Sequence, residues 1–291
     1  MGMPSKIIDA HMHFSDIQKF HNAAVTSGAD YSFGGYMKER AECGVVASVC
    51  MGLAETTAAA FPDNAAPSPM IADLDANRPP NLFVCLGINP HLLDERNIPK
   101  IEQMLVGDGV LDVPNIVGFK IYAGYYHYHI HDMIYAPVYK LAAKYNLPVA
   151  IHTGDTYSDK GLLKYAHPLE ADQLALNWRD VNFVLCHMGD PWIMDACEVA
   201  YKNDNVCVDI SGMLAGNAAD IAAVEKREAA MQHYKQGAAY LNNYKKILFG
   251  TDWPLVPMAA YIEFCKKLVP ESAYEDVFYN NALRVYHKIC L

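Results

Sequence analysis

Two histidines separated by one residue occur near the start of the chain, in the run Ile8-Asp9-Ala10-His11-Met12-His13-Phe14. If this run forms a strand, side chains two residues apart share a face, so the imidazoles of His11 and His13 point together. Paired imidazoles are common ligands of a divalent metal ion. Taken alone, this pair is equally compatible with a metal site and with ordinary structural histidines.

Three later residues that can also bind a metal ion, two histidines and an aspartate, each follow an apolar run. They are His152 after 149–151, His187 after 181–186 and Asp252 after 246–250. Apolar runs of this length, rich in β-branched residues, predict buried strands. In a barrel of parallel strands the active site lies at the carboxyl ends of the strands, so these side chains would meet there with the two early histidines. Such a placement is improbable by coincidence, and it favours a metal site.

The elements that must position these residues follow a regular alternation of short apolar runs and amphipathic segments. We predict strands over 6–14, 45–52, 82–89, 116–122, 149–154, 181–188, 206–212 and 246–252. We predict helices over 134–145, 190–202, 218–241, 258–268 and 274–288, the last of them packed outside the barrel. Eight strands alternating with helices predict an α/β fold, the (β/α)8 TIM barrel. The segment 54–69, rich in Ala and Pro, is expected to form a loop or an irregular helix.

Length and composition limit the classes of function. The 291 residues, 52% of them hydrophobic, are enough for one large core, so we expect a single domain over 1–291. We expect no signal peptide or membrane anchor, because no run approaches the roughly 20 apolar residues of a membrane span. A formal charge of −10 disfavours nucleic acid and anionic membrane surfaces. The eight scattered cysteines favour buried thiols in a reducing cytoplasm. A small-molecule substrate is therefore expected, and a homo-oligomer remains open.

The sequence resembles the amidohydrolase superfamily, and within it the amidohydrolase-2 group of amide and lactone hydrolases and non-oxidative aromatic decarboxylases. The similarity extends over nearly the whole chain. Its motifs are 8–13, Gly118-Phe119-Lys120, 148–154, Gly250-Thr251-Asp252-Trp253-Pro254 and 281–286. By this resemblance the metal ligands are His11, His13, His152 and Asp252, and His187 polarises the substrate or steadies the attacking water. Imidazoles with a carboxylate suit one divalent ion, Zn2+ as the first choice and Mn2+ as the second.

Substrate contacts are expected from Lys120, Tyr122 and Trp253. By the resemblance Lys120 could be carboxylated and bridge two metals, contact substrate, or form a structural salt bridge; we predict an unmodified amine beside one ion. Tyr122 opens a loop, 122–132, that should cover the active face. Its three alternate histidines could bind another ion, but a lid-forming aromatic loop is favoured. Other residues are expected to shape the pocket or only to pack in the barrel and its rim: Asp209, Ser211 and Trp192.

The leading functional hypothesis is a hydrolase that attacks an amide, lactone or ester bond with a metal-activated water. Asp252 would accept the water's proton and pass it to the leaving group, and His187 would stabilise the oxyanion. The alternative is a non-oxidative decarboxylase of an aromatic or unsaturated acid, in which Asp252 protonates carbon. A barrel that binds a metabolite without turnover is a third, less favoured hypothesis. The ligand residues alone do not separate the first two.

Overall fold

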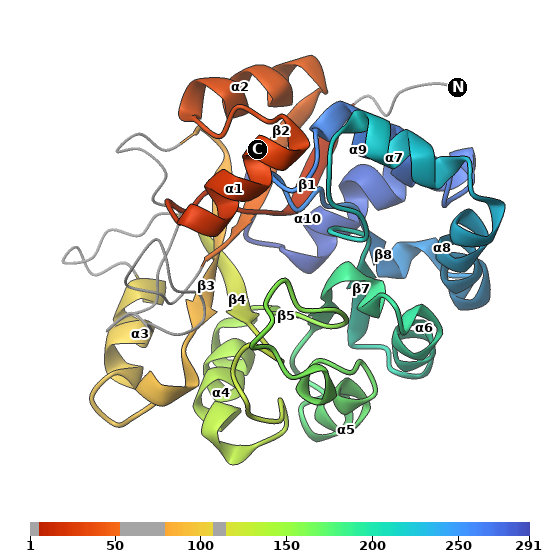
Figure 1. The fold of residues 1–291 in the computed structure, drawn as a ribbon. Helices are drawn as coiled ribbons and strands as arrows, with labels where there is room; N and C mark the ends of the chain where they lie inside the picture. The colour runs from red at the N-terminus through yellow and green to blue at the C-terminus, as the bar shows by residue number, and fades with distance from the viewer. Residues whose placement is uncertain (1–5, 53–78, 107–114) are drawn as a thin grey trace.

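The computed structural model describes residues 6–52, 79–106 and 115–291, in which a parallel sheet is surrounded by helices (Figure 1). Its eight strands follow one another in chain order from β1 to β8. They are β1 (Ile7–Met12), β2 (Val45–Met51), β3 (Leu82–Ile88), β4 (Ile116–Ile121), β5 (Val149–Ile151), β6 (Phe183–Leu185), β7 (Val206–Asp209) and β8 (Ile247–Leu248). The predicted (β/α)8 TIM barrel is confirmed. The segment 54–69 lies outside the described residues.

Backbone hydrogen bonds between the first strand and the residues after β8 complete the barrel. The amide of Ala10 donates to the carbonyl of Phe249 at 2.9 Å, and the amide of His13 donates to that of Trp253 at 2.8 Å. Between them, the amide of Asp252 donates to the carbonyl of His11 at 2.7 Å. These bonds join the first strand to the segment after β8 and place both early histidines beside Asp252.

The later strands are shorter than the sequence predicts, because the residues with ligand chemistry leave the strand conformation. His187 and Asp252 have φ angles of 60° and 59°, in the left-handed region that residues with a Cβ rarely adopt. A residue with this φ cannot continue a β ladder, so neither predicted strand can run through its ligand residue; β6 ends at Leu185 and β8 at Leu248. The apolar runs therefore mark the strands correctly but extend into the loops that form the site.

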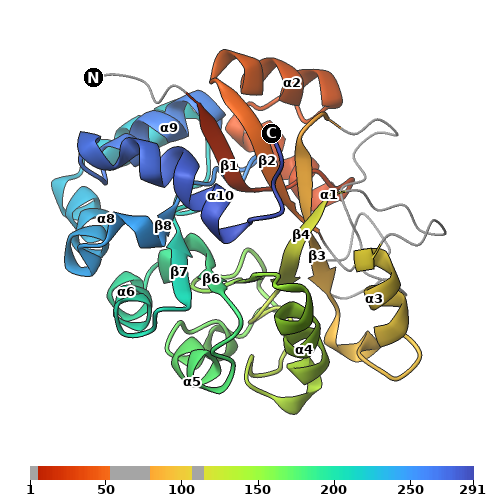
Figure 2. The ribbon, with the colours of Figure 1, turned by 180° about the vertical axis from the view of Figure 1, so that it is seen from behind.

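Helices form the outer layer of the barrel, as the view from behind shows (Figure 2). They are α1 (Gln18–Ser27), α2 (Phe33–Glu42), α3 (Ile98–Val106), α4 (Ala136–Tyr145), α5 (Glu170–Asn177), α6 (Ile193–Lys202), α7 (Ala218–Glu225), α8 (Glu228–Leu241) and α9 (Met258–Lys266). A further short helix, α10 (Asn281–Val285), lies at the end of the barrel. Their apolar faces pack against the strands, and charged faces meet solvent. No helix in the described ranges has both the length and the apolar character needed to span a bilayer.

Two helix predictions need correction. The predicted helix 218–241 is two helices, α7 and α8, because Arg227 between them has an extended backbone, with φ −93° and ψ 100°. The predicted helix 274–288 is a π-helical turn (Asp276–Asn280) followed by α10. Its first part, with Tyr274, Val277 and Phe278, packs among the outer helices as predicted, but Val285 and Tyr286 are buried among the inward-facing side chains of the strands. The C-terminal segment therefore closes the end of the barrel opposite the site (Figure 2).

Candidate active site

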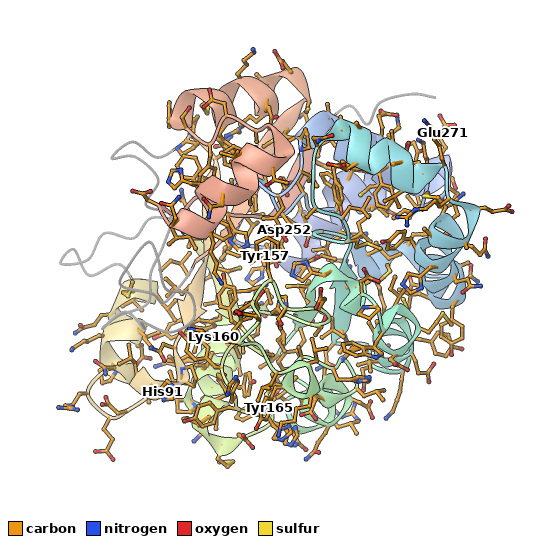
Figure 3. The ribbon with its side chains drawn as sticks, in the orientation of Figure 1. His91, Tyr157, Lys160, Tyr165, Asp252 and Glu271 are labelled. Carbon is orange, nitrogen blue, oxygen red and sulfur yellow. The ribbon has the colours of Figure 1, made fainter. Side chains whose placement is uncertain are left out.

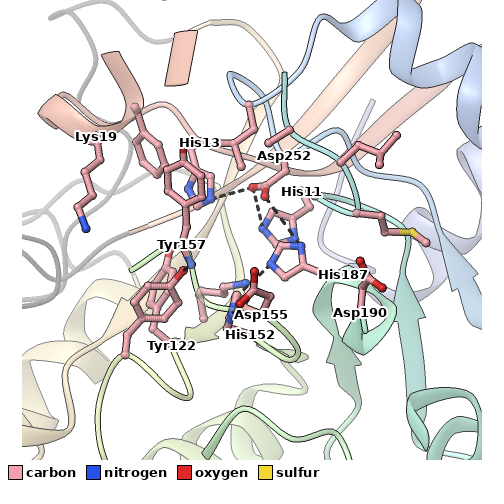
Figure 4. A pocket seen from close by; sticks show the side chains of 18 of the residues that line it. His11, His13, Lys19, Tyr122, His152, Asp155, Tyr157, His187, Asp190 and Asp252 are labelled. Carbon is pink, nitrogen blue, oxygen red and sulfur yellow. Dashed lines mark hydrogen bonds and ion pairs between the residues drawn. The ribbon is translucent and has the colours of Figure 1, made fainter. Parts of the chain in front are cut away.

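A cavity of about 310 Å3 opens among the loops that follow the carboxyl ends of the strands (Figure 4). All but one of the predicted site residues line it: His11, His13, Lys120, Tyr122, His152, His187 and Asp252. They come from β1 and β4 and from the residues directly after β1, β4, β5, β6 and β8. The strand ends thus deliver them to one place, as the barrel geometry requires.

His11 is fixed with one particular ring nitrogen toward the cavity. Its Nδ1 lies 2.9 Å from Oδ2 of Asp209, and a carboxylate oxygen can only accept, so the ring proton is on Nδ1. Nε2 then carries a lone pair and faces Oδ1 of Asp252 at 3.5 Å. Both atoms are buried and lack a hydrogen-bond partner among the described residues. A cation between or beside these two facing acceptors would satisfy both of them together.

His13 adds a third acceptor by the same logic. Its Nδ1 lies 3.2 Å from the carbonyl oxygen of Met51, which assigns the ring proton to Nδ1. Its Nε2 lies 3.0 Å from Oδ1 of Asp252. The ligand atoms of His11, His13 and Asp252 all lie within 4.8 Å of one another. Three buried lone pairs that converge on one point fit a divalent metal ion.

The charges at this point are strongly perturbed. Burial lowers the pKa of His11 and favours its neutral form, which is the form that binds a metal ion. Burial raises the pKa of Asp252, but the nearby imidazoles of His13, His11 and His187 outweigh burial and hold that pKa well below its usual range. The pKa of Asp209 is also held well below its usual range, because His11 outweighs burial. Both aspartates are therefore anionic.

His152 and His187 form a pair on the other side of Asp252. Nδ1 of His152 lies 3.1 Å from Nε2 of His187, and their outer nitrogens lie 2.9 and 3.1 Å from the carbonyls of Asp155 and Ser211. Burial lowers the pKa of His187 to about 4 and that of His152 well below its usual value. Two neutral rings carry only two N–H groups for these three contacts. Each ring therefore has one unprotonated nitrogen, which is the form that binds a metal ion.

The structure does not place His152 with the converging group. Among the described residues, two groups at this site have ligand atoms within 4.8 Å of one another, His11, His13 and Asp252, and His11, His187 and Asp209; neither includes His152. Both nitrogens of His152 contact other groups, so it reaches an ion held by the converging group only by giving up the Asp155 carbonyl or His187. His187 is nearer, since its Nδ1 lies 3.9 Å from Oδ2 of Asp252.

Gly212 gives Asp252 and His187 the space they occupy. Its φ is 56°, and a Cβ there would lie 2.3 Å from Oδ2 of Asp252 and 2.6 Å from Nδ1 of His187. Neither contact is possible between non-bonded atoms. The loop after β7 therefore needs glycine for both its backbone conformation and its close approach to the site.

The predicted substrate contacts divide into two that line the cavity and one that does not. Lys120 is buried with its Nζ 2.9 Å from Sγ of Cys186, and Tyr122 donates its hydroxyl to the carbonyl of Gly52 at 2.9 Å. Trp253 is fully buried away from the cavity, where its indole N–H donates to Oε2 of Glu39 at 2.8 Å. Its ring packs against Phe14, Tyr31 and Tyr36. Trp253 anchors α2 to the barrel.

Several lining residues were not predicted from the sequence. They are Lys19, Phe20, Asp155, Tyr157 and Asp190, whereas Tyr125 belongs to the loop 122–132 that was expected to cover the active face. Asp155 and Asp190 each follow a site histidine by three residues, a spacing that could have marked them. Lys19 and Phe20 lie at the start of α1, and only the path of that helix brings them to the cavity. Figure 3 shows Tyr157 and Asp252 near the middle of the barrel. Asp209 and Ser211 lie behind the site: Asp209 orients His11, and Ser211 contacts both His11 and His187.

Comparison with known proteins identifies the class to which this barrel belongs. The family model for amidohydrolases matches residues 8–288. The chain therefore belongs to the amidohydrolase family, as its motifs predict. No curated protein matches it in sequence.

Solved structures share the fold at low sequence identity. An uncharacterised TIM-barrel protein from Bordetella bronchiseptica has a TM-score of 0.70 and 17% identity, covering 98% of this chain and 99% of that one. A dihydroxybenzoic acid decarboxylase from Polaromonas sp. JS666, with bound manganese and 2-nitroresorcinol, has a TM-score of 0.63 and 13% identity, and the match covers 97% of each chain. A probable 2-pyrone-4,6-dicarboxylic acid hydrolase from Acinetobacter baumannii has a TM-score of 0.60 and 13% identity. The match covers 97% of this chain and 99% of that one.

Proposed function

We propose that this chain is a metal-dependent hydrolase that cleaves an amide, lactone or ester bond of a small molecule with an activated water. The observation that carries the proposal is the convergence of the unprotonated nitrogens of His11 and His13 on the carboxylate of Asp252. His152 completes the proposed ligand set. A divalent ion bound there supplies the Lewis acidity that activates water at neutral pH. Zn2+ is the first choice and Mn2+ the second; the Polaromonas decarboxylase that shares the fold holds manganese.

Asp252 and His187 perform the proton chemistry in this proposal. Asp252 is anionic, and its Oδ2 faces the imidazole of His187 at 3.9 Å. The carboxylate accepts the proton of the attacking water and delivers it to the leaving group. His187 is neutral because burial lowers its pKa to about 4, so a ring N–H can donate to the substrate oxygen as negative charge develops on it.

The cavity wall indicates which small molecules fit. Tyr122, Tyr125 and Tyr157 supply aromatic surface, and Lys19 and Lys120 supply two ammonium groups. Aromatic side chains pack against flat, unsaturated groups, while an ammonium attracts a carboxylate. We therefore propose a small planar acid as the substrate class, held by an unmodified Lys120 beside one metal ion. We also propose that one cytoplasmic domain, 1–291, carries this activity.

The same wall favours a second candidate function, a non-oxidative decarboxylase. Three tyrosines and two lysines suit a hydroxylated benzoate, and the Polaromonas relative is a dihydroxybenzoic acid decarboxylase. In this candidate Asp252 delivers a proton to ring carbon as carbon dioxide leaves. Three carboxylates, Asp155, Asp190 and Asp252, also line the cavity and oppose a substrate with more than one acidic group in either candidate.

Turnover of a substrate panel separates the two candidates. The protein, loaded with Zn2+ or with Mn2+, is incubated with lactones and amides of planar acids and with hydroxybenzoates. Hydrolysis is followed by acid release, and decarboxylation by evolved carbon dioxide. The hydrolase proposal expects turnover of a lactone or amide that the His11→Ala variant lacks. Carbon dioxide release from a hydroxybenzoate, with no hydrolysis in the panel, would replace it with the decarboxylase.

A further inference from the structure

A second group of possible metal ligands lies outside the active-site cavity, on the loop that follows β4. It consists of His129 and His131 from this loop and Glu170, the first residue of α5; we call these three residues the outer cluster. Nδ1 of His129 lies 2.8 Å and Nδ1 of His131 3.2 Å from the same oxygen, Oε2 of Glu170. The three potential ligand atoms all lie within 4.8 Å of one another.

Hydrogen bonding accounts for only one of the two imidazoles. Nδ1 of His129 makes a hydrogen bond with Glu170. Nδ1 of His131 is buried and lacks a hydrogen-bond partner among the described residues, although Oε2 of Glu170 lies 3.2 Å away. A buried polar atom without a partner is unfavourable. A cation bound by both nitrogens and the carboxylate would satisfy all three groups together.

The loop is held in the shape that presents both rings. The backbone amide of His129 donates to Oδ2 of Asp132 at 2.9 Å. The rings of His129 and His131 stack with centroids 5.2 Å apart, and Tyr165 packs edge-on against His129 at 4.7 Å. These contacts leave both Nδ1 atoms directed at Glu170. The site is therefore largely formed before any ion binds.

The outer cluster is open to solvent on one side. The side chains of His129, His131 and Glu170 are 39%, 28% and 20% exposed. A pocket of about 390 Å3 adjoins them, lined by His131 and Glu170 together with His167 and other residues. An ion could enter from this side and keep a water as its fourth ligand. Two imidazoles and one carboxylate with an open position are a known donor set for Zn2+.

We propose that the outer cluster binds one Zn2+ ion and so clamps the loop between β4 and α4 to α5. The same loop carries Tyr125, which lines the cavity and packs edge-on against His152 with ring centroids 4.9 Å apart. The hydroxyl of Tyr125 accepts the backbone amide of Tyr157 at 2.7 Å. The ion therefore steadies one wall of the active-site cavity from outside.

Zinc stoichiometry tests the site, with His127→Asn as the matched control. His127 belongs to the same alternate series of histidines, but its Nε2 lies 3.1 Å from the carbonyl of Lys160 and not at the cluster. The full chain is equilibrated with a small excess of zinc, dialysed and analysed. Wild type and His127→Asn should hold one more equivalent than His131→Asn and Glu170→Gln. Equal zinc in all four proteins overturns the proposal.

The same comparison in a His11→Ala background separates the outer ion from the proposed active-site ion. One equivalent should remain there and disappear with Glu170→Gln, whatever the catalytic function proves to be. Hydrogen–deuterium exchange of residues 125–132 tests the clamp: zinc should slow it in wild type and in His127→Asn but not in Glu170→Gln. Glu170→Gln gives this comparison even if His131→Asn does not fold. If zinc binds but does not slow the exchange of these residues, the metal site exists but does not clamp the loop.

Discussion

Two groups in this molecule share one sequence pattern, two histidines separated by one residue with a carboxylate from a distant segment. The inner group is His11, His13 and Asp252, and the outer group is His129, His131 and Glu170. The inner side chains are buried, with exposed fractions of 0%, 8% and 7%. The outer ones are 39%, 28% and 20% exposed. The same pattern therefore occurs in two very different environments.

The difference shows that the surrounding scaffold, more than the ligand spacing, determines the burial and the protonated ring nitrogen of each histidine in such a pair. In the inner group a separate acceptor fixes the proton of each ring, Asp209 for His11 and the carbonyl of Met51 for His13. In the outer group both rings contact the one carboxylate oxygen of Glu170. Fixed tautomers and exclusion of water strengthen metal binding. We therefore expect the inner group to hold its ion more tightly.

Removal of an inner ligand has the largest expected effect. His11→Ala and Asp252→Ala should lose bound metal and lower kcat/KM by about 1000-fold or more, because Lewis-acid stabilisation is worth several kcal/mol. Metal analysis and kinetics on the substrate found in the panel check this. His21→Ala is the control, since His21 pairs with Asp16 on the surface at 2.6 Å. A fully metallated, active His11→Ala protein would refute the ligand assignment.

His187→Ala separates catalysis from metal binding at the inner group. It should retain most of its metal while kcat falls by about 100-fold to 1000-fold, the usual effect of removing a donor to a developing oxyanion. KM should change much less than kcat. Loss of the ion comparable to that in His11→Ala would instead make His187 a ligand.

Gly212→Ala tests whether the crowded packing around the inner carboxylate is required. The new Cβ would displace Asp252 and His187, and a misplacement of about 1 Å can lower the rate about 100-fold. Gly34→Ala is the matched control, because Gly34 is helical and the nearest heavy atom to its added Cβ is 3.9 Å away. Thermal unfolding of both variants shows whether the loss is local. Full activity of Gly212→Ala would mean that the loop moves freely.

Asp209→Asn tests the acceptor that fixes the ring proton of His11. Metal affinity should fall by about 10-fold to 100-fold, because such partners orient a ligand and increase its basicity. Titration of the metal-free variant with Zn2+ measures the change, and saturating zinc should restore most of the activity. An unchanged affinity would show that the barrel backbone alone positions His11.

Stepwise chelation compares the two groups directly and has the smallest expected effect on turnover. The outer ion should leave first, because its ligands are exposed and its fourth position is open. Activity should fall only slightly through this first loss, as one wall of the cavity loosens, and should be lost with the second. Metal content and rate are followed together at increasing chelator concentration. Almost complete loss of activity with the first ion would reverse the assignment of the tighter site.

The parts of the fold that depend on local pattern could be predicted from the sequence. The eight apolar runs mark the eight strands, and the residues after them line the cavity. Strand ends could not be predicted, because His187 and Asp252 adopt left-handed backbone angles that an apolar pattern does not record. The packing side of the C-terminal segment and of Trp253 was also missed. In the sequence, Trp253 is an apolar residue and the C-terminal segment is an apolar helix, and neither pattern shows which neighbours it packs against.

The sequence by itself determined the alternation of strands and helices, the family, and the identity of the histidines and aspartate at the strand ends. Side-chain alternation is a property of the strand, so it can be recognised within a few residues. Tertiary structure decided which nitrogen of each histidine is unprotonated. Asp209 reaches His11 across 198 positions of sequence, and a proton's position depends on the acceptor that the fold brings to it.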